Sequence, residues 1–106
     1  MNNTSSCKHV DSEGVIRYYF NNVLHRTDGP AFISSKCKKY YYNGKLHRDN
    51  DKPAVVWYSL DNNDYCMWYR YGKLHRIGKP AVMYLDQVEY WVNDIRCNIA
   101  QYKLNN

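Results

Sequence analysis

One short pattern is written three times in this chain of 106 residues, and it constrains the fold more than any other feature. In each copy, aromatic residues precede a turn-forming pair, which is followed by Leu-His-Arg and then, five or six residues after the histidine, by Pro-Ala. The histidines of the three copies are His25, His47 and His75. Repetition at such short intervals indicates stacked copies of one unit, because each copy alone buries too little surface to be stable.

The turn-forming pair predicts a β-hairpin in every copy. Asn43-Gly44 is the strongest of these pairs, since both residues tolerate the positive φ of a type I′ turn. Asn21-Asn22 and Tyr71-Gly72 occupy the same place, as does Asn93-Asp94 in a degenerate fourth copy without histidine. The flanks are aromatic and β-branched, which is typical of strands. We therefore expect an all-β fold, an antiparallel meander of repeated β-hairpins that forms an open, twisted sheet.

The length of the chain is that of a single domain, which we place at residues 1–106. We place the repeats at approximately 14–36, 37–60 and 65–86, with the degenerate fourth copy at 87–100 as a capping repeat. Residues 1–12 and 101–106 are expected to be capping or frayed ends.

The pattern Tyr-Tyr-x-Asn-Gly-Lys-Leu-His-Arg, with a later Gly-Pro-Ala, resembles the MORN-like repeat variants. It is most similar to the His-Arg/Gly-Pro-Ala version found in proteins of giant viruses and bacteriophages. The resemblance covers roughly residues 14 to 98, but the standard MORN pattern is richer in glycine and lacks Leu-His-Arg. It implies a sheet of repeated β-hairpins and a role in binding or scaffolding, sometimes at membranes. It implies no catalytic residues.

Alternation of side chains along a strand divides the repeated residues between two faces of the sheet. One face receives three tyrosine–leucine pairs, here called the Tyr–Leu row: Tyr19–Leu24, Tyr41–Leu46 and Tyr69–Leu74. The other face receives an aromatic–histidine row: Tyr18–His25, Tyr40–His47 and Trp68–His75. We expect the Tyr–Leu row to be the packed side, because it is apolar and recurs in every full copy.

Two interpretations of the histidine-arginine pair remain open. As part of the scaffold, each histidine ring binds carbonyl groups of the Asp-Gly-Pro loop, and the arginine binds Asp28 or Asp49. As a ligand site, an aromatic ring, a histidine and an arginine stack a base or bind a phosphate. The threefold repetition favours the scaffold, and it disfavours catalysis because an active site rarely recurs three times in a small domain.

The sequence offers little to support catalysis, a metal or a cofactor, and we expect none of the three. The four cysteines are isolated and form no Cys-x-x-Cys ligand pair. Histidines on successive hairpins lie about 10 Å or more apart if one strand intervenes, too far for a shared ion. The chain start has no apolar signal segment, so we expect free thiols and a cytoplasmic location, in the host cell if the protein is viral.

The composition suits a binding protein, because seventeen of the residues are aromatic and the net charge is +5. Tyr, Trp and Arg dominate binding hot spots. Five of the aromatic residues exceed what a small core can hold: Trp57, Tyr58, Trp68, Tyr84 and Trp91. We expect a non-catalytic binding module. By analogy with the resembling proteins, it is a virus- or phage-type protein that binds and blocks a host protein, for example as an anti-CRISPR inhibitor.

Two other functions stay open. One is binding of a nucleotide or single-stranded nucleic acid by the aromatic-His-Arg row, and the other is a scaffold on anionic membranes, which scattered lysines disfavour. A homodimer formed through an exposed sheet edge is also possible. The candidate binding residues are Tyr18, His25, Arg26, Tyr40, His47, Arg48, Trp57, Trp68, His75 and Arg76.

Overall fold

The computed structural model describes residues 6–61 and 63–98. The expected C-terminal end at 101–106, the last two residues of the expected fourth repeat and residues 1–5 lie outside this part of the chain. In the described part, no helix is long and apolar enough to cross a membrane.

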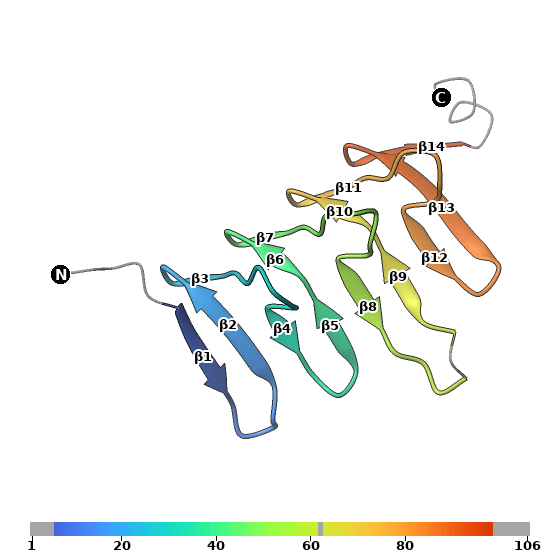
Figure 1. Cartoon of the computed structure of the whole chain (residues 1–106). Helices are drawn as coiled ribbons and strands as arrows, with labels where there is room; N and C mark the ends of the chain where they lie inside the picture. The colour runs from blue at the N-terminus through green and yellow to red at the C-terminus, as the bar shows by residue number, and fades with distance from the viewer. Residues whose placement is uncertain (1–5, 62, 99–106) are drawn as a thin grey trace.

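The described residues form fourteen β-strands and no helix (Figure 1). In chain order the strands are β1 (Ser6–Val10), β2 (Ile16–Phe20), β3 (Val23–Leu24), β4 (Phe32–Ile33), β5 (Cys37–Lys39), β6 (Tyr41–Tyr42), β7 (Lys45–Leu46), β8 (Val55–Trp57), β9 (Tyr65–Met67), β10 (Tyr69–Arg70), β11 (Lys73–Leu74), β12 (Val82–Tyr84), β13 (Gln87–Val92) and β14 (Ile95–Cys97).

The strands form one open antiparallel meander with a row of small hairpins along it. The main sheet has the order β1-β2-β4-β5-β8-β9-β12-β13-β14, and β3 pairs beside β2. The pairs β6-β7 and β10-β11 continue the row that β2-β3 begins and β13-β14 ends (Figure 1). The all-β antiparallel meander predicted from the sequence is therefore confirmed.

The sheet has two long rims, which lie at opposite ends of the strands (Figure 1). The first, called the turn rim, consists of the four tight turns with one residue on either side, at 20–23, 42–45, 70–73 and 92–95. The second, called the loop rim, consists of the connections at the other end of the strands, at 11–15, 34–36, 58–61, 63–64 and 85–86; the last of these is a two-residue turn.

All four tight turns have the backbone that the sequence predicts. Both central residues of each turn have positive φ, as a type I′ hairpin turn requires. The strongest pair, Asn43-Gly44, has φ values of 48° and 81°. Tyr71 adopts φ 47°, a conformation that is unusual for a bulky side chain. The register is also as expected, since Tyr41 pairs with Leu46.

The sheet is a thin slab with principal dimensions of 53, 35 and 18 Å, so few side chains are fully enclosed. The alanines of the three Pro-Ala pairs, Ala31, Ala54 and Ala81, are completely buried. Each occupies a position where its backbone bonds strands on both sides. The Ala31 N–H, for example, donates to Lys39, and its carbonyl accepts from Tyr18. Such a position suits a small side chain in a close-packed layer.

The expectation that the Tyr–Leu row is the packed side is wrong. All six of its side chains are only half-buried, and burial raises the pKa of Tyr41 and Tyr69. Trp68 and His47 of the opposite row are more deeply buried, at 9% and 6% exposure. A single layer has no second sheet to cover one face, so the two faces share the burial.

Candidate functional site

Each histidine holds the hairpin of the next repeat. Its Nδ1 accepts the backbone N–H of the first turn residue of that hairpin, at distances of 2.8, 3.0 and 3.1 Å: Asn43 on His25, Tyr71 on His47 and Asn93 on His75. The second turn residue donates to the carbonyl of the leucine before the histidine, at 2.7 to 2.9 Å. Leu-His is thus a pair of acceptors for the two exposed N–H groups of a type I′ turn.

The expected partner of the histidine ring was therefore wrong, although the ring does act in the scaffold. We expected it to bind the carbonyl groups of the following loop. In the structure Nδ1 accepts a backbone N–H, so this nitrogen carries no proton and cannot donate to a carbonyl. The loop carbonyls are bound by the arginines, whose Nη1 donates at 3.1 Å to the proline carbonyl in all three repeats: Arg26 to Pro30, Arg48 to Pro53 and Arg76 to Pro80.

The same guanidinium groups cover the aromatic ring that begins each repeat. The guanidinium carbon lies 3.8 to 3.9 Å from the ring centroid in three pairs: Arg26 over Tyr18, Arg48 over Tyr40 and Arg76 over Trp68. Such stacking is a cation–π contact, and it strengthens when the groups are shielded from water. Each arginine therefore joins the start of its repeat to the loop that ends it.

Three loop carboxylates complete the arrangement, in part as expected. Arg26 binds Asp28 at 2.9 Å, as the sequence predicts. Asp49 accepts instead from Nε2 of His47, at 2.9 Å. Arg76 binds both carboxylate oxygens of Asp51, at 2.7 and 3.1 Å, and this bond lowers the pKa of Asp51.

The histidine rings contact a different set of aromatic residues from the one expected. Phe20, His25, Tyr42, His47 and Tyr71 form a continuous row of rings close to the turn rim, with neighbouring centroids 4.0 to 6.1 Å apart. His47 and Tyr71 are the closest pair and are nearly parallel, at 19°. This stack supports the turn in which Tyr71 has positive φ.

The fourth copy has a cysteine where the other copies have a histidine. Trp91 pairs with Arg96 as Tyr69 pairs with Leu74, so Cys97 occupies the histidine position. Within the described residues, β14 is the last strand of the row. The assignment of this copy as a capping repeat stays a prediction.

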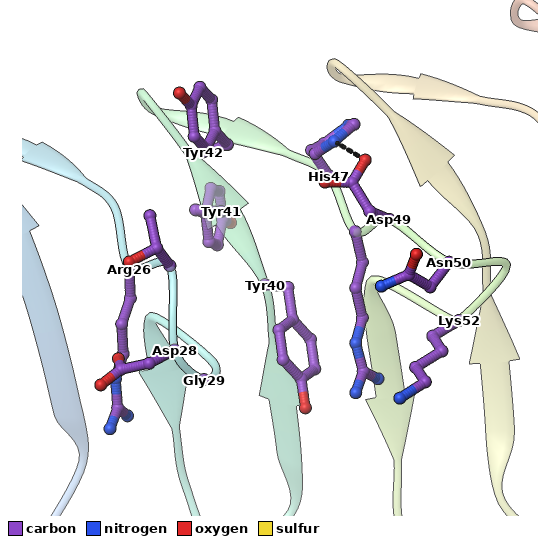
Figure 2. A pocket seen from close by; sticks show the side chains of 12 residues that line it. Arg26, Asp28, Gly29, Tyr40, Tyr41, Tyr42, His47, Asp49, Asn50 and Lys52 are labelled. Atoms are coloured by element: carbon purple, nitrogen blue, oxygen red, sulfur yellow. Dashed lines mark hydrogen bonds and ion pairs between the residues drawn. The ribbon is translucent and has the colours of Figure 1, made fainter.

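Three adjoining grooves lie beside the arginine loops of the repeats. The central groove has a volume of about 470 Å³, and Figure 2 shows Tyr40 between the loop of Arg26 and Asp28 and the loop of Asn50 and Lys52. A second groove, of about 280 Å³, follows at Trp68 and shares Arg48, Asp49 and Asn50 with the first. A third groove, of about 490 Å³, precedes the central groove at Tyr18. The three form one shallow track across the repeats.

Nine of the ten candidate residues line these grooves: Tyr18, His25, Arg26, Tyr40, His47, Arg48, Trp68, His75 and Arg76. The tenth, Trp57, lies apart from them at the end of β8 and is 41% exposed. Tyr58 and Tyr84 are exposed as predicted, whereas Trp68 is buried.

Two residues of the central groove, Asn50 and Lys52, were not predicted from the sequence. Their loop is one residue longer than in the other repeats, which is a visible signal.

The grooves suit some ligands better than others. The aromatic faces are already covered by guanidinium groups, so a base cannot stack there without displacing an arginine. Arg26, Arg48 and Lys52 in the central groove are matched by Asp28 and Asp49, which makes the lining of mixed charge. Among the described residues, no three His, Cys, Asp or Glu side chains are placed to hold a metal ion.

No protein-family model, curated protein or solved structure matches the chain.

Proposed function

We propose that this protein is a non-catalytic binding module, and that it holds an extended segment of a partner protein along the track of three grooves. The observation that carries this proposal is the mixed lining of the track, in which arginines and lysine alternate with carboxylates beside aromatic rings. A polypeptide presents donors, acceptors and both charges, and such a lining can meet all of them.

The dimensions of the repeat also favour an extended polypeptide. Each repeat adds two strands to the main sheet, so successive grooves recur about 10 Å apart. Three residues of extended chain span about the same distance. A bound segment in the polyproline II conformation, which has three residues per turn, would then place every third side chain in a groove. The histidine and arginine bonds hold the grooves in shape before binding, which limits the ordering cost of association.

The nucleic-acid alternative is less favoured by the same geometry. Single-stranded nucleic acid needs exposed aromatic faces and a groove of one positive sign. Here the rings lie under guanidinium groups, and carboxylates line the groove. A viral or phage origin, a blocked host protein and a cytoplasmic location remain proposals that rest on the resemblance of the repeat. The membrane alternative has the same basis.

Site-specific photo-crosslinking tests the proposal. Thr27 is exposed, lies in two of the grooves and takes no part in the histidine or arginine bonds, so a photoreactive amino acid there samples a bound segment. Val88, exposed on β13 and outside the three grooves and both rims, is the matched control position. We expect crosslinks to a protein from position 27 alone, and we expect them to persist at about 1 M salt. Recovery of nucleic acid that is lost at high salt, or equal crosslinking from both positions, contradicts the proposal.

A further inference from the structure

Among the described residues, seven of the thirteen exposed large apolar side chains lie on the two rims. The turn rim exposes one large apolar residue in each of its four turns: Val23, Tyr42, Tyr71 and Ile95, between 41% and 68% exposed. The loop rim exposes Tyr58, Leu60 and Leu85, at 45%, 108% and 54%. Apolar groups gathered in this way mark a contact surface.

The two rims carry opposite charge. The loop rim holds five acidic residues against one basic residue, Lys36: Asp11, Glu13, Asp61, Asp64 and Asp86. The turn rim holds three basic residues against one acidic residue, Asp94: Lys45, Arg70 and Lys73. Two turn rims, or two loop rims, would repel each other, whereas a turn rim and a loop rim attract.

A strained residue in the loop rim adds an independent observation. Leu85 adopts φ 53°, in the left-handed region that normally favours glycine or asparagine, and yet its side chain faces solvent. Leu85 and Asp86 form the two-residue turn between β12 and β13, where glycine or asparagine would cost less than leucine. An exposed leucine at this strained position points to a function for the side chain.

We propose that the protein associates with a second copy of itself, with the loop rim of one copy docked on the turn rim of the next. Both rims run along the sheet (Figure 1), and a strip of the longest and shortest dimensions, 53 by 18 Å, is at most about 950 Å². Stable interfaces use about 800 Å² on each partner. The two surfaces differ, so the contact is heterologous and leaves a free rim at each end. The proposal does not depend on the grooves.

Two variants with altered rim charge test this contact by sedimentation velocity. Lys45→Glu with Lys73→Glu changes the net charge of the turn rim from +2 to −2, and glutamate keeps the side-chain carbons up to Cδ, which limits the change in packing against Gly72. Glu13→Lys with Asp86→Lys changes the net charge of the loop rim from −4 to zero, which removes its attraction for a turn rim. Among the described residues, neither of these two carboxylates accepts a hydrogen bond from its loop.

We expect wild-type protein to associate as its concentration rises from about 10 µM to about 1 mM, a range that covers weak interfaces. Association should weaken when salt rises from about 0.1 M to about 1 M. Each variant alone should associate at least about a hundredfold more weakly. A mixture of the two variants should form a one-to-one dimer, because each retains one intact rim and the two intact rims are complementary. Recovery in the mixture also shows that both variants are folded.

Three results overturn the proposal. The first is wild-type protein that stays monomeric over the whole concentration range. The second is a mixture of the variants that does not dimerise although near-ultraviolet circular dichroism shows both to be folded. The third is association that survives both sets of charge changes and is abolished by Lys8→Pro in the edge strand β1, because the Lys8 N–H faces away from β2 and that result assigns the contact to edge pairing.

Discussion

Replacing His47 by alanine removes the most enclosed of the three histidine contacts. The side chain is 5% exposed and makes three contacts at once. Its Nδ1 accepts from the Tyr71 N–H at 3.0 Å, its ring stacks on the Tyr71 ring at 4.0 Å, and its Nε2 contacts Asp49 at 2.9 Å. Alanine keeps none of them, and the N–H of the third turn loses its acceptor.

The expected cost follows from these contacts. A neutral hydrogen bond contributes about 1 kcal/mol, and an aromatic pair adds about 0.5 to 1.5 kcal/mol. The contact with Asp49 adds only about 0.2 to 1 kcal/mol, because that carboxylate is 69% exposed to water. The variant should therefore lose about 2 to 3 kcal/mol of unfolding free energy. For a domain of this size, that corresponds to a fall in Tm of about 10 to 20 °C.

Thermal and urea unfolding, followed by tryptophan fluorescence, measure this loss. His47→Asn is the matched variant, since its amide oxygen can replace Nδ1 as the acceptor while the ring is lost, so its Tm should fall between alanine and wild type. His9→Ala is the control, because His9 is exposed on β1 and its loss should cost less than about 0.5 kcal/mol. A His47→Ala protein that melts within about 2 °C of wild type refutes the scaffold role of the histidine.

Three further predictions concern pH, a strained leucine and the thiols. Burial, and then the nearby Arg70, lower the pKa of His75 below 6.5, so the unfolded chain takes up the proton first as pH falls. Stability should be full above pH 6.5 and decline as the pH falls through the folded pKa. A urea midpoint that rises on acidification contradicts this, and His75→Asn should reduce the slope. Leu85→Asn should raise stability by about 1 kcal/mol because it relieves backbone strain, and it should also weaken self-association; a lower Tm would count against it. In timed alkylation read by mass spectrometry, the exposed Cys7 should react first and the buried Cys37 last, and the reverse order would contradict the burial described here.

The hairpins could be predicted from the sequence because their signals are local. Positive φ at two neighbouring positions selects asparagine, aspartate and glycine, and Asn43-Gly44 shows that choice plainly. Once a two-residue turn is placed, the pairing of Tyr41 with Leu46 follows from chain geometry alone. Turns and register therefore needed no knowledge of the rest of the molecule.

The histidine partner and the buried side could not be predicted, because they depend on contacts between repeats. The N–H that binds His25 lies eighteen residues away, in another hairpin. The sequence also gives no sign that the sheet is a single layer. The expectation that the Tyr–Leu row is packed is wrong because it assumes a second layer that covers one face. The ion pair of Arg26 with Asp28 could be predicted, because the two residues are close neighbours in one loop.

The histidine bonds also give the array a direction. In all three instances described, the histidine ring of one repeat binds the turn of the next repeat and not the turn of the previous one. Damage to one copy therefore loosens the unit downstream of it. A whole copy inserted between two existing repeats would supply a histidine for the turn that follows it. Its own turn would bind the histidine of the repeat before it.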